Sequence, residues 1–142
     1  EFGHVGMPGR VNTSLLSALL DAGFLPVISP LASNAGGPGA LNGNGDDAAA
    51  AIAVATAAEE LLIVADVDGV LDAEGKAFGA LDVFSARELI ASGTATNGMA
   101  AKLEAAHAAL AGGVPSVRVA PLSGVLDGSL GTTITLAPSL VA

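Results

Sequence analysis

The strongest constraint on the fold is a regular alternation of helical segments with short runs of aliphatic residues. Three runs stand out, FLPVIS (24–29), LLIVA (61–65) and SVRVA (116–120), and TTITL (132–136) is a fourth candidate strand. Apolar strands without polar alternation are typical of parallel sheets that are covered on both faces. The sequence therefore predicts an α/β fold, a three-layer αβα sandwich around a largely parallel central sheet.

The segments between these runs have helical spacing and recognisable end signals. Alanines or leucines recur at helical intervals, and glycines follow several of the segments. A loop rich in glycine and proline is expected over residues 30–45. Four helices are expected. One follows an N-cap at Asn12, one covers about 46–58, one covers about 86–91 after a Ser85–Glu88 capping box, and one covers about 99–111.

Composition narrows the class of protein. The chain has 142 residues, of which 51% are hydrophobic, enough for one ordinary domain with a core. Its apolar runs fall short of the roughly 20 residues that cross a bilayer. It has no cysteine and no recognisable signal peptide, so we expect a soluble, cytoplasmic protein. The formal charge of −9 would repel a phosphate backbone, which argues against nucleic acid as a partner.

The stretch LNGNGDD, residues 41–47, concentrates polar side chains at the start of a predicted helix. Asn44 or Asp46 can serve as the N-cap and stabilise the helix by about 1 kcal/mol. A single cap does not require Asn42, Asn44 and Asp46 together, and the intervening glycines let a ligand approach the backbone closely. A structural cap and a ligand site therefore remain as alternatives.

Lys102 is expected in the first turn of the helix at 99–111. A cation there faces the positive end of the helix dipole, which disfavours it by a few tenths of a kcal/mol. A phosphate held by the first backbone amides of the helix would remove this conflict. A lysine that simply points into solvent is the alternative.

The loop DVDGVL, Asp66–Leu71, follows the predicted strand at 61–65 directly. Its carboxylates could hold a magnesium ion, bond a ribose or form an Asx turn. His107 has no second histidine or cysteine beside it, so we expect no dedicated metal site on the protein.

Taken in order, these segments resemble the C-terminal, nucleotide-binding half of the amino acid kinase family, in the branch that acts on N-acetyl-L-glutamate. The matching motifs are N-x-N-x-D-x-A-A in LNGNGDDAA (41–49), D-V-x-G in ADVDGVL (65–71) and G-M-x-x-K in NGMAAK (97–102). GSLGTTI (128–134) is similar to the family's terminal G-x-G-T strand start. FLPVISPL (24–31) is similar to the family's strand before the substrate loop. One departure is Asn97, which stands where the family usually has glycine.

The resemblance implies ATP-dependent phosphorylation of the side-chain carboxylate of N-acetyl-L-glutamate, a step of arginine biosynthesis. It implies that Asp46 positions catalytic lysines and that Lys102 stabilises charge on the nucleotide side. It also implies that Asn42 contacts the amino-acid substrate and that Asn44 supports the loop near the substrate. Mg²⁺ would arrive mainly on the ATP phosphates. The implied ATP-binding residues are Asp66, Val67, Asp68, Gly69, Val70, Leu71, Thr94, Ala95 and Thr96.

Family members begin with a glycine-rich, lysine-bearing loop and a substrate lobe, and neither has a counterpart in this sequence. We therefore expect residues 1–142 to form a single domain equivalent to the ATP-binding lobe, and whether this domain is active by itself stays open. Whether the protein forms a homo-oligomer through the other lobe stays open. Two alternatives also remain: a kinase for acetylaminoadipate or a related amino acid, and a non-catalytic nucleotide-binding module.

Overall fold

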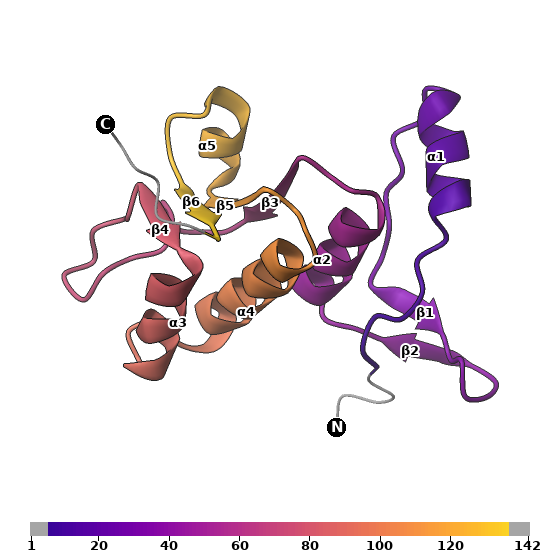
Figure 1. Cartoon of the computed structure of the whole chain (residues 1–142), viewed down its shortest axis with the longest axis horizontal. Helices are drawn as coiled ribbons and strands as arrows, with labels where there is room; N and C mark the ends of the chain where they lie inside the picture. The colour runs from indigo at the N-terminus through magenta and orange to yellow at the C-terminus, as the bar shows by residue number, and fades with distance from the viewer. Residues whose placement is uncertain (1–5, 137–142) are drawn as a thin grey trace.

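A computed structural model describes residues 6–136 of the chain, apart from the side chains of residues 126 and 127 (Figure 1). A hairpin of two antiparallel strands stands apart from a four-stranded sheet of order β3-β5-β6-β4. The elements are α1 (Thr13–Asp21), β1 (Leu31–Ser33), β2 (Ala40–Asn42), α2 (Gly45–Ala55), β3 (Glu60–Val64), β4 (Ala80–Asp82), α3 (Val83–Ala91), α4 (Asn97–Ala111), β5 (Ser116–Ala120), α5 (Leu122–Asp127) and β6 (Thr132–Thr135).

The four-stranded sheet is mainly parallel. β3 pairs in parallel with β5, from Glu60 opposite Ser116 to Val64 opposite Ala120, and β4 pairs in parallel with β6. Only the β5–β6 contact is antiparallel in this sheet. Figure 1 shows α2, α3 and α4 on one side of the sheet and α5 on the other. The predicted α/β class, with a largely parallel sheet flanked by helices, is confirmed.

The core lies between the sheet and the helices α2, α3 and α4. Leu103 and Leu110 of α4 pack with Val117 and Val119 of β5, and all four side chains are almost completely buried. Between α2 and α4 the contacts are mostly alanine, and a Cβ added at Gly112 would collide with Val54. Small side chains let two helices approach closely, so this packing brings the starts of α2 and α4 together.

The strand predicted at 24–29 is not formed. Phe24, Leu25 and Val27 are exposed, Val27 to 93%, and no strand in the described part of the chain pairs with this segment. An aliphatic run becomes a buried strand only when a neighbouring strand and a covering layer are available. The prediction was wrong because neither is present beside these residues.

The prediction that LLIVA is buried on both faces was also wrong. In β3, Leu61 and Ile63 face the core, whereas Leu62 and Val64 are exposed. The short helix α5 packs against β3 and β5 on that outer face and covers only part of it. The sheet is therefore well covered on the α2–α4 side and sparsely covered on the other.

Several boundaries differ from the predictions. The expected loop at 30–45 contains the β1–β2 hairpin, whose turn Asn34 closes by accepting a hydrogen bond from the Gly36 N–H at 2.9 Å. Strand β4 and helix α5 were not predicted. The Asn12 cap of α1 is confirmed, since Asn12 Oδ1 accepts from the Leu15 N–H at 3.1 Å.

Helix α3 starts earlier than predicted because a different residue caps it. Asp82 Oδ1 accepts from the N–H groups of Phe84 and Ser85 at 2.8 and 2.9 Å, and Asp82 Oδ2 accepts from the Ser85 hydroxyl. The predicted Ser85–Glu88 capping box is therefore wrong. The bonds from Ser85 hold the pKa of Asp82 below its usual value, because they favour the ionised carboxylate.

Candidate functional site

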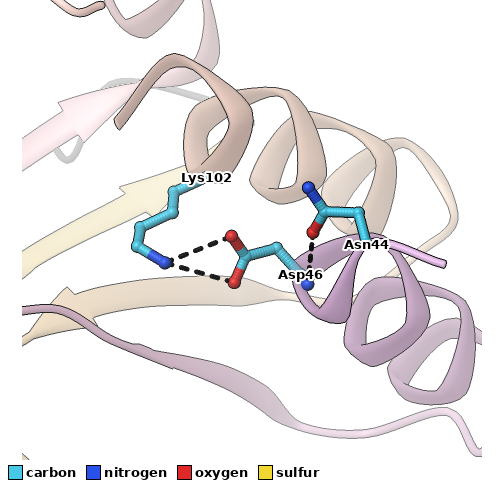
Figure 2. Close-up of polar contacts among 3 residues, drawn as sticks. All are labelled: Asn44, Asp46 and Lys102. Carbon is cyan, nitrogen blue, oxygen red and sulfur yellow. Dashed lines mark hydrogen bonds and ion pairs between the residues drawn. The ribbon is translucent and has the colours of Figure 1, made fainter. Parts of the chain in front are cut away.

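Asn44 and Asp46, two polar residues at the start of α2, have different roles. Asn44 Oδ1 accepts a hydrogen bond from the Asp46 N–H at 2.7 Å, so Asn44 is the N-cap. The alternative that Asp46 caps the helix is therefore wrong. The Asp46 carboxylate instead points towards α4 (Figure 2).

Asp46 and Lys102 form a direct ion pair between α2 and α4 (Figure 2). Lys102 Nζ donates to Asp46 Oδ2 at 3.1 Å and to Asp46 Oδ1 at 3.3 Å. The lysine side chain is 22% exposed and the aspartate side chain 24%, so solvent screens the pair only in part but can still reach it. The carboxylate therefore fixes the direction of the ammonium group at an accessible position.

Lys102 lies in the second turn of α4, not in the first as predicted. The helix begins at Asn97, two residues before the expected start. Because the dipole effect falls off within the first turn, it gives little reason for or against a cation at this position. The position of Lys102 is explained by its contact with Asp46.

The chain enters α4 through an unusual backbone conformation. Asn97 has φ +47°, in the left-handed region that asparagine tolerates better than most residues. The glycine that the resembled motif carries at this position would suit the same conformation. The departure from the motif at Asn97 therefore preserves the turn that leads into the helix.

The connections between α2 and β3 and between α4 and β5 show at which edge of the sheet the two helices begin. Residues 56–59 join α2 to β3, and residues 112–115 join α4 to β5. Since each helix also packs on the strand that follows it, such short connections require the helix to run antiparallel to that strand. The starts of α2 and α4 therefore lie at the edge where β3 and β5 end.

The loop Asp66–Leu71 leaves β3 at this edge. Asp66 and Asp68 are exposed, whereas Gly69 and Val70 are buried. The Val70 N–H donates to Thr132 Oγ1 at 2.8 Å. Thr132, which is not among the predicted site residues, thus ties the loop to the start of β6.

The segment Thr94–Thr96 leads directly into α4. Ala95 is buried and its N–H donates to the Leu89 carbonyl at 2.8 Å, which holds the segment against α3. Thr96 is the N-cap residue of α4 but makes no side-chain capping bond. The segment therefore borders the backbone amides at the start of α4, the kind of group that binds phosphate in many proteins.

The remaining predicted residue, Asn42, is the last residue of β2. Its side chain is exposed, and it precedes the Asn44 cap by two positions. The structure thus brings Asp46 and Lys102 into contact, places the loop after β3 and the Thr94–Thr96 segment at the same edge, and leaves Asn42 and Asn44 on the chain that enters α2.

Two cavities lie away from the ion pair. One of about 690 Å³ lies between α1, the β1–β2 hairpin and α2, and one of about 420 Å³ lies between the segment near Met7 and the α2–α4 pair. Neither Asp46 nor Lys102 lines them.

Within residues 6–136, no three or more histidines, aspartates and glutamates gather as a metal-binding group. His107 contacts Arg87 of α3, whose Nη2 donates to His107 Nε2 at 2.6 Å. No helix in the described ranges is long and apolar enough to cross a bilayer.

Comparison with known proteins identifies the family. The profile of the Amino acid kinase family matches residues 1–121. The chain therefore belongs to the amino acid kinase family. Among curated proteins it is similar to acetylglutamate kinases: 44% identical to that of Rubrobacter xylanophilus over 138 residues, and 44% identical to that of Cereibacter sphaeroides over 117 residues. The first match covers 93% of this chain and 53% of the relative, and the second covers 82% and 40%.

Solved structures agree with this assignment. The smu.665 protein of Streptococcus mutans superposes with a TM-score of 0.85 at 30% identity, covering 95% of this chain and 52% of that chain. N-acetylglutamate synthase from Neisseria gonorrhoeae gives a TM-score of 0.84 at 28% identity, and the match covers 96% of this chain and 33% of the synthase chain. The carbamate kinase of Giardia lamblia bound to AMP-PNP shares the fold, with a TM-score of 0.76 at 18% identity. The match covers 92% of this chain and 46% of the carbamate kinase chain. The chain spans about half the length of the curated relatives it matches.

Proposed function

We propose that this chain is the nucleotide-binding half of an ATP-dependent kinase that phosphorylates the side-chain carboxylate of N-acetyl-L-glutamate. The similarity to acetylglutamate kinases supports the substrate class. The observation that carries the proposal is the ion pair between Asp46 and Lys102 at the edge where β3 and β5 end.

The reaction requires alignment and charge neutralisation more than proton transfer. A carboxylate acceptor is already ionised at neutral pH, so it needs no general base. Transfer of the γ-phosphoryl group spreads negative charge over its oxygens, which a fixed cation stabilises. An ammonium has three N–H donors, and the two contacts with Asp46 leave one for a phosphoryl oxygen. Lys102 is the cation in this proposal, and Asp46 holds its direction.

The other predicted residues surround this pair in the proposed complex. The Asp66–Leu71 loop and the Thr94–Thr96 segment bind the adenosine part of ATP, and the first amides of α4 receive its phosphates. Asn42 and Asn44 belong to the substrate side. Asn44 Oδ1 is already used in capping α2, so Asn42 is the stronger candidate for direct contact with the amino acid.

Mg²⁺ is expected to enter with the nucleotide. Both carboxylate oxygens of Asp46 bond to Lys102, and residues 6–136 contain no acidic cluster that would cage a cation. Such a setting suits Mg²⁺ that keeps most of its waters and is held mainly by the ATP phosphates, where it neutralises their charge.

The rest of the kinase fold is proposed to pack on the surface formed by α1 and residues 24–31. No side chain of α1 is buried, and Phe24, Leu25, Ile28 and Leu31 are exposed beside it. Several exposed large apolar side chains in one segment are typical of an interface. The fact that the chain spans about half of its relatives supports this division, in which residues 1–142 are one domain.

ATP-binding calorimetry on this chain tests the nucleotide-binding part of the proposal. We expect binding of ATP with Mg²⁺, weakened in Lys102→Ala. Hydroxamate detection of acyl phosphate then tests catalysis after the chain is mixed with the part of the Rubrobacter xylanophilus kinase that lies outside the match. Acyl phosphate formed from N-acetyl-L-glutamate supports the proposal. Faster product formation from acetylaminoadipate would mean that acetylaminoadipate, and not N-acetyl-L-glutamate, is the phosphoryl acceptor. Binding without product favours a non-catalytic module, and absence of ATP binding contradicts all of these readings.

A further inference from the structure

We infer that Thr132 is a positioning residue that fixes the Asp66–Leu71 loop in the conformation that receives the nucleotide. The inference rests on the proposed function, because it assigns to that loop the contact with ATP. Thr132 is the first residue of β6 and is 0% exposed. It is 62 residues away from Val70 in the sequence, so only the tertiary fold brings the two together.

The hydroxyl of Thr132 bonds to both ends of the loop between Val70 and Phe78, an excursion of the chain away from the sheet. Its Oγ1 accepts from the Val70 N–H at 2.8 Å and donates to the Phe78 carbonyl at 2.6 Å. The Phe78 N–H in turn donates to the Val70 carbonyl at 2.9 Å. One buried hydroxyl therefore satisfies a donor and an acceptor that close the base of the excursion.

The chain between Val70 and Phe78 is ordered by its own turn. Asp72 Oδ1 accepts from the N–H groups of Glu74 and Lys76 at 3.0 and 2.8 Å, and Leu71 forms an isolated bridge with Ala77. These local bonds shape the turn but do not attach it to the sheet. Thr132 supplies the attachment, together with the Thr133 N–H, which donates to the Gly79 carbonyl at 3.1 Å.

Gly69 shows how closely the loop approaches Thr132. Its φ is +150°, and a Cβ added there would lie 2.6 Å from Thr132 Oγ1 and 3.1 Å from the Thr132 nitrogen. The backbone at Gly69 therefore packs directly against Thr132 without room for a side chain. Asp68 directly precedes this contact and is exposed, so the contact at Thr132 restricts the backbone that carries Asp68.

The inference requires the hydroxyl and not merely the volume of the side chain. Valine has nearly the same shape as threonine, but it would leave the Val70 N–H and the Phe78 carbonyl without their buried partner. Serine keeps the hydroxyl. The two substitutions therefore separate the effect of the hydrogen bonds from the effect of packing.

The test compares Thr132→Val, Thr132→Ser and the control Thr133→Val in the complete 142-residue chain. We measure the Kd for ATP with Mg²⁺ by calorimetry, the thermal midpoint, and hydrogen exchange at the Val70 amide without nucleotide. We expect Thr132→Val to raise the Kd at least about tenfold and to speed Val70 exchange. Thr132→Ser should retain the wild-type Kd within about threefold. Thr133→Val should leave both the Kd and the exchange rate at Val70 unchanged.

The outcomes are distinguishable from those for the proposed function. A folded Thr132→Val chain with a lower thermal midpoint but the wild-type Kd would overturn the inference, because Thr132 would then be purely structural. Unchanged exchange at Val70 would overturn it too. If Thr132→Val does not fold, Gly69→Ala tests the same contact, and a wild-type Kd in that variant counts against the inference. A wild-type chain that binds no ATP contradicts the proposed function, whatever the exchange data show.

Discussion

Lys102 Nζ lies 3.1 Å from Asp46 Oδ2, across the contact between α4 and α2. The two residues are 56 positions apart in the sequence, Asp46 in the first turn of α2 and Lys102 in the second turn of α4. Close packing of alanines and glycine between these helices permits the contact, and the Asn44 cap leaves Asp46 available for it. The predictions below follow from this arrangement and from the turns beside it.

Replacing Lys102 by alanine is expected to lower the turnover of the complete kinase at least about tenfold, which corresponds to about 1.4 kcal/mol of transition-state stabilisation. The reason is the loss of the cation that we propose neutralises the transferring phosphoryl group. Hydroxamate detection of acyl phosphate measures the effect. Lys76→Ala, which removes the same charge from an exposed side chain, is the control and should keep its activity. An unchanged turnover in Lys102→Ala would refute the role.

Asp46→Asn is expected to lower turnover by a similar factor, about tenfold, while α2 stays folded. The amide has the same shape but no charge to direct the Lys102 ammonium, and the Asn44 cap is left in place. Steady-state kinetics together with circular dichroism provide the measurement. Asp47→Asn, in the same helical turn, is the matched control. Normal kinetics in Asp46→Asn would mean that the ion pair is structural only.

Asn97→Ala is expected to destabilise the chain by about 1 kcal/mol, whereas Asn97→Gly should be close to neutral. The backbone at Asn97 has φ +47°, where a Cβ without a compensating polar group costs about 1–2 kcal/mol. Glycine adopts this conformation without that penalty. Urea unfolding measures the free-energy differences. Equal stability of the alanine variant and the wild type would show that the turn relaxes without cost.

The Asp82 cap is expected to stabilise α3 near neutral pH and to weaken in acid. Its pKa in the folded chain is lowered, first by the bond from the Ser85 N–H, so its contribution is full above the unfolded value of 3.8. It is lost as the pH falls from about 4 through the lower folded pKa. The stability difference between wild type and Asp82→Ala should therefore shrink below about pH 4. Hydrogen exchange at Phe84 and Ser85 follows the cap directly, and a difference that is independent of pH would contradict this prediction.

Much of the fold could be predicted because it depends on local patterns. The strand at 116–120 matches β5, and the helices at 46–58 and 99–111 match α2 and α4 within a few residues. Aliphatic runs, alanine-rich segments and terminal glycines determine these elements through contacts a few residues apart. The N-x-N-x-D-x-A-A and G-M-x-x-K motifs also predict Asp46 and Lys102 as site residues.

Other features could not be predicted because they depend on partners far away in the chain. FLPVIS has the pattern of a buried strand, yet residues 24–29 have no strand beside them and remain exposed. Asp82 and Ser85 are both good capping residues, and the position of β4 beside β6 decides in favour of Asp82. Thr132 carries no local signal of its contact with Val70.

The sequence by itself determined most of the helices, the strands β3, β5 and β6, and the polar residues at the start of α2, because these features depend on neighbours within about one or two turns. The tertiary structure alone decided that Asp46 pairs with Lys102 and that Thr132 holds the loop after β3. Both contacts join residues that are far apart in the sequence, so they form only after helices and strands pack, and burial of the Thr132 hydroxyl excludes the water that would otherwise satisfy its partners.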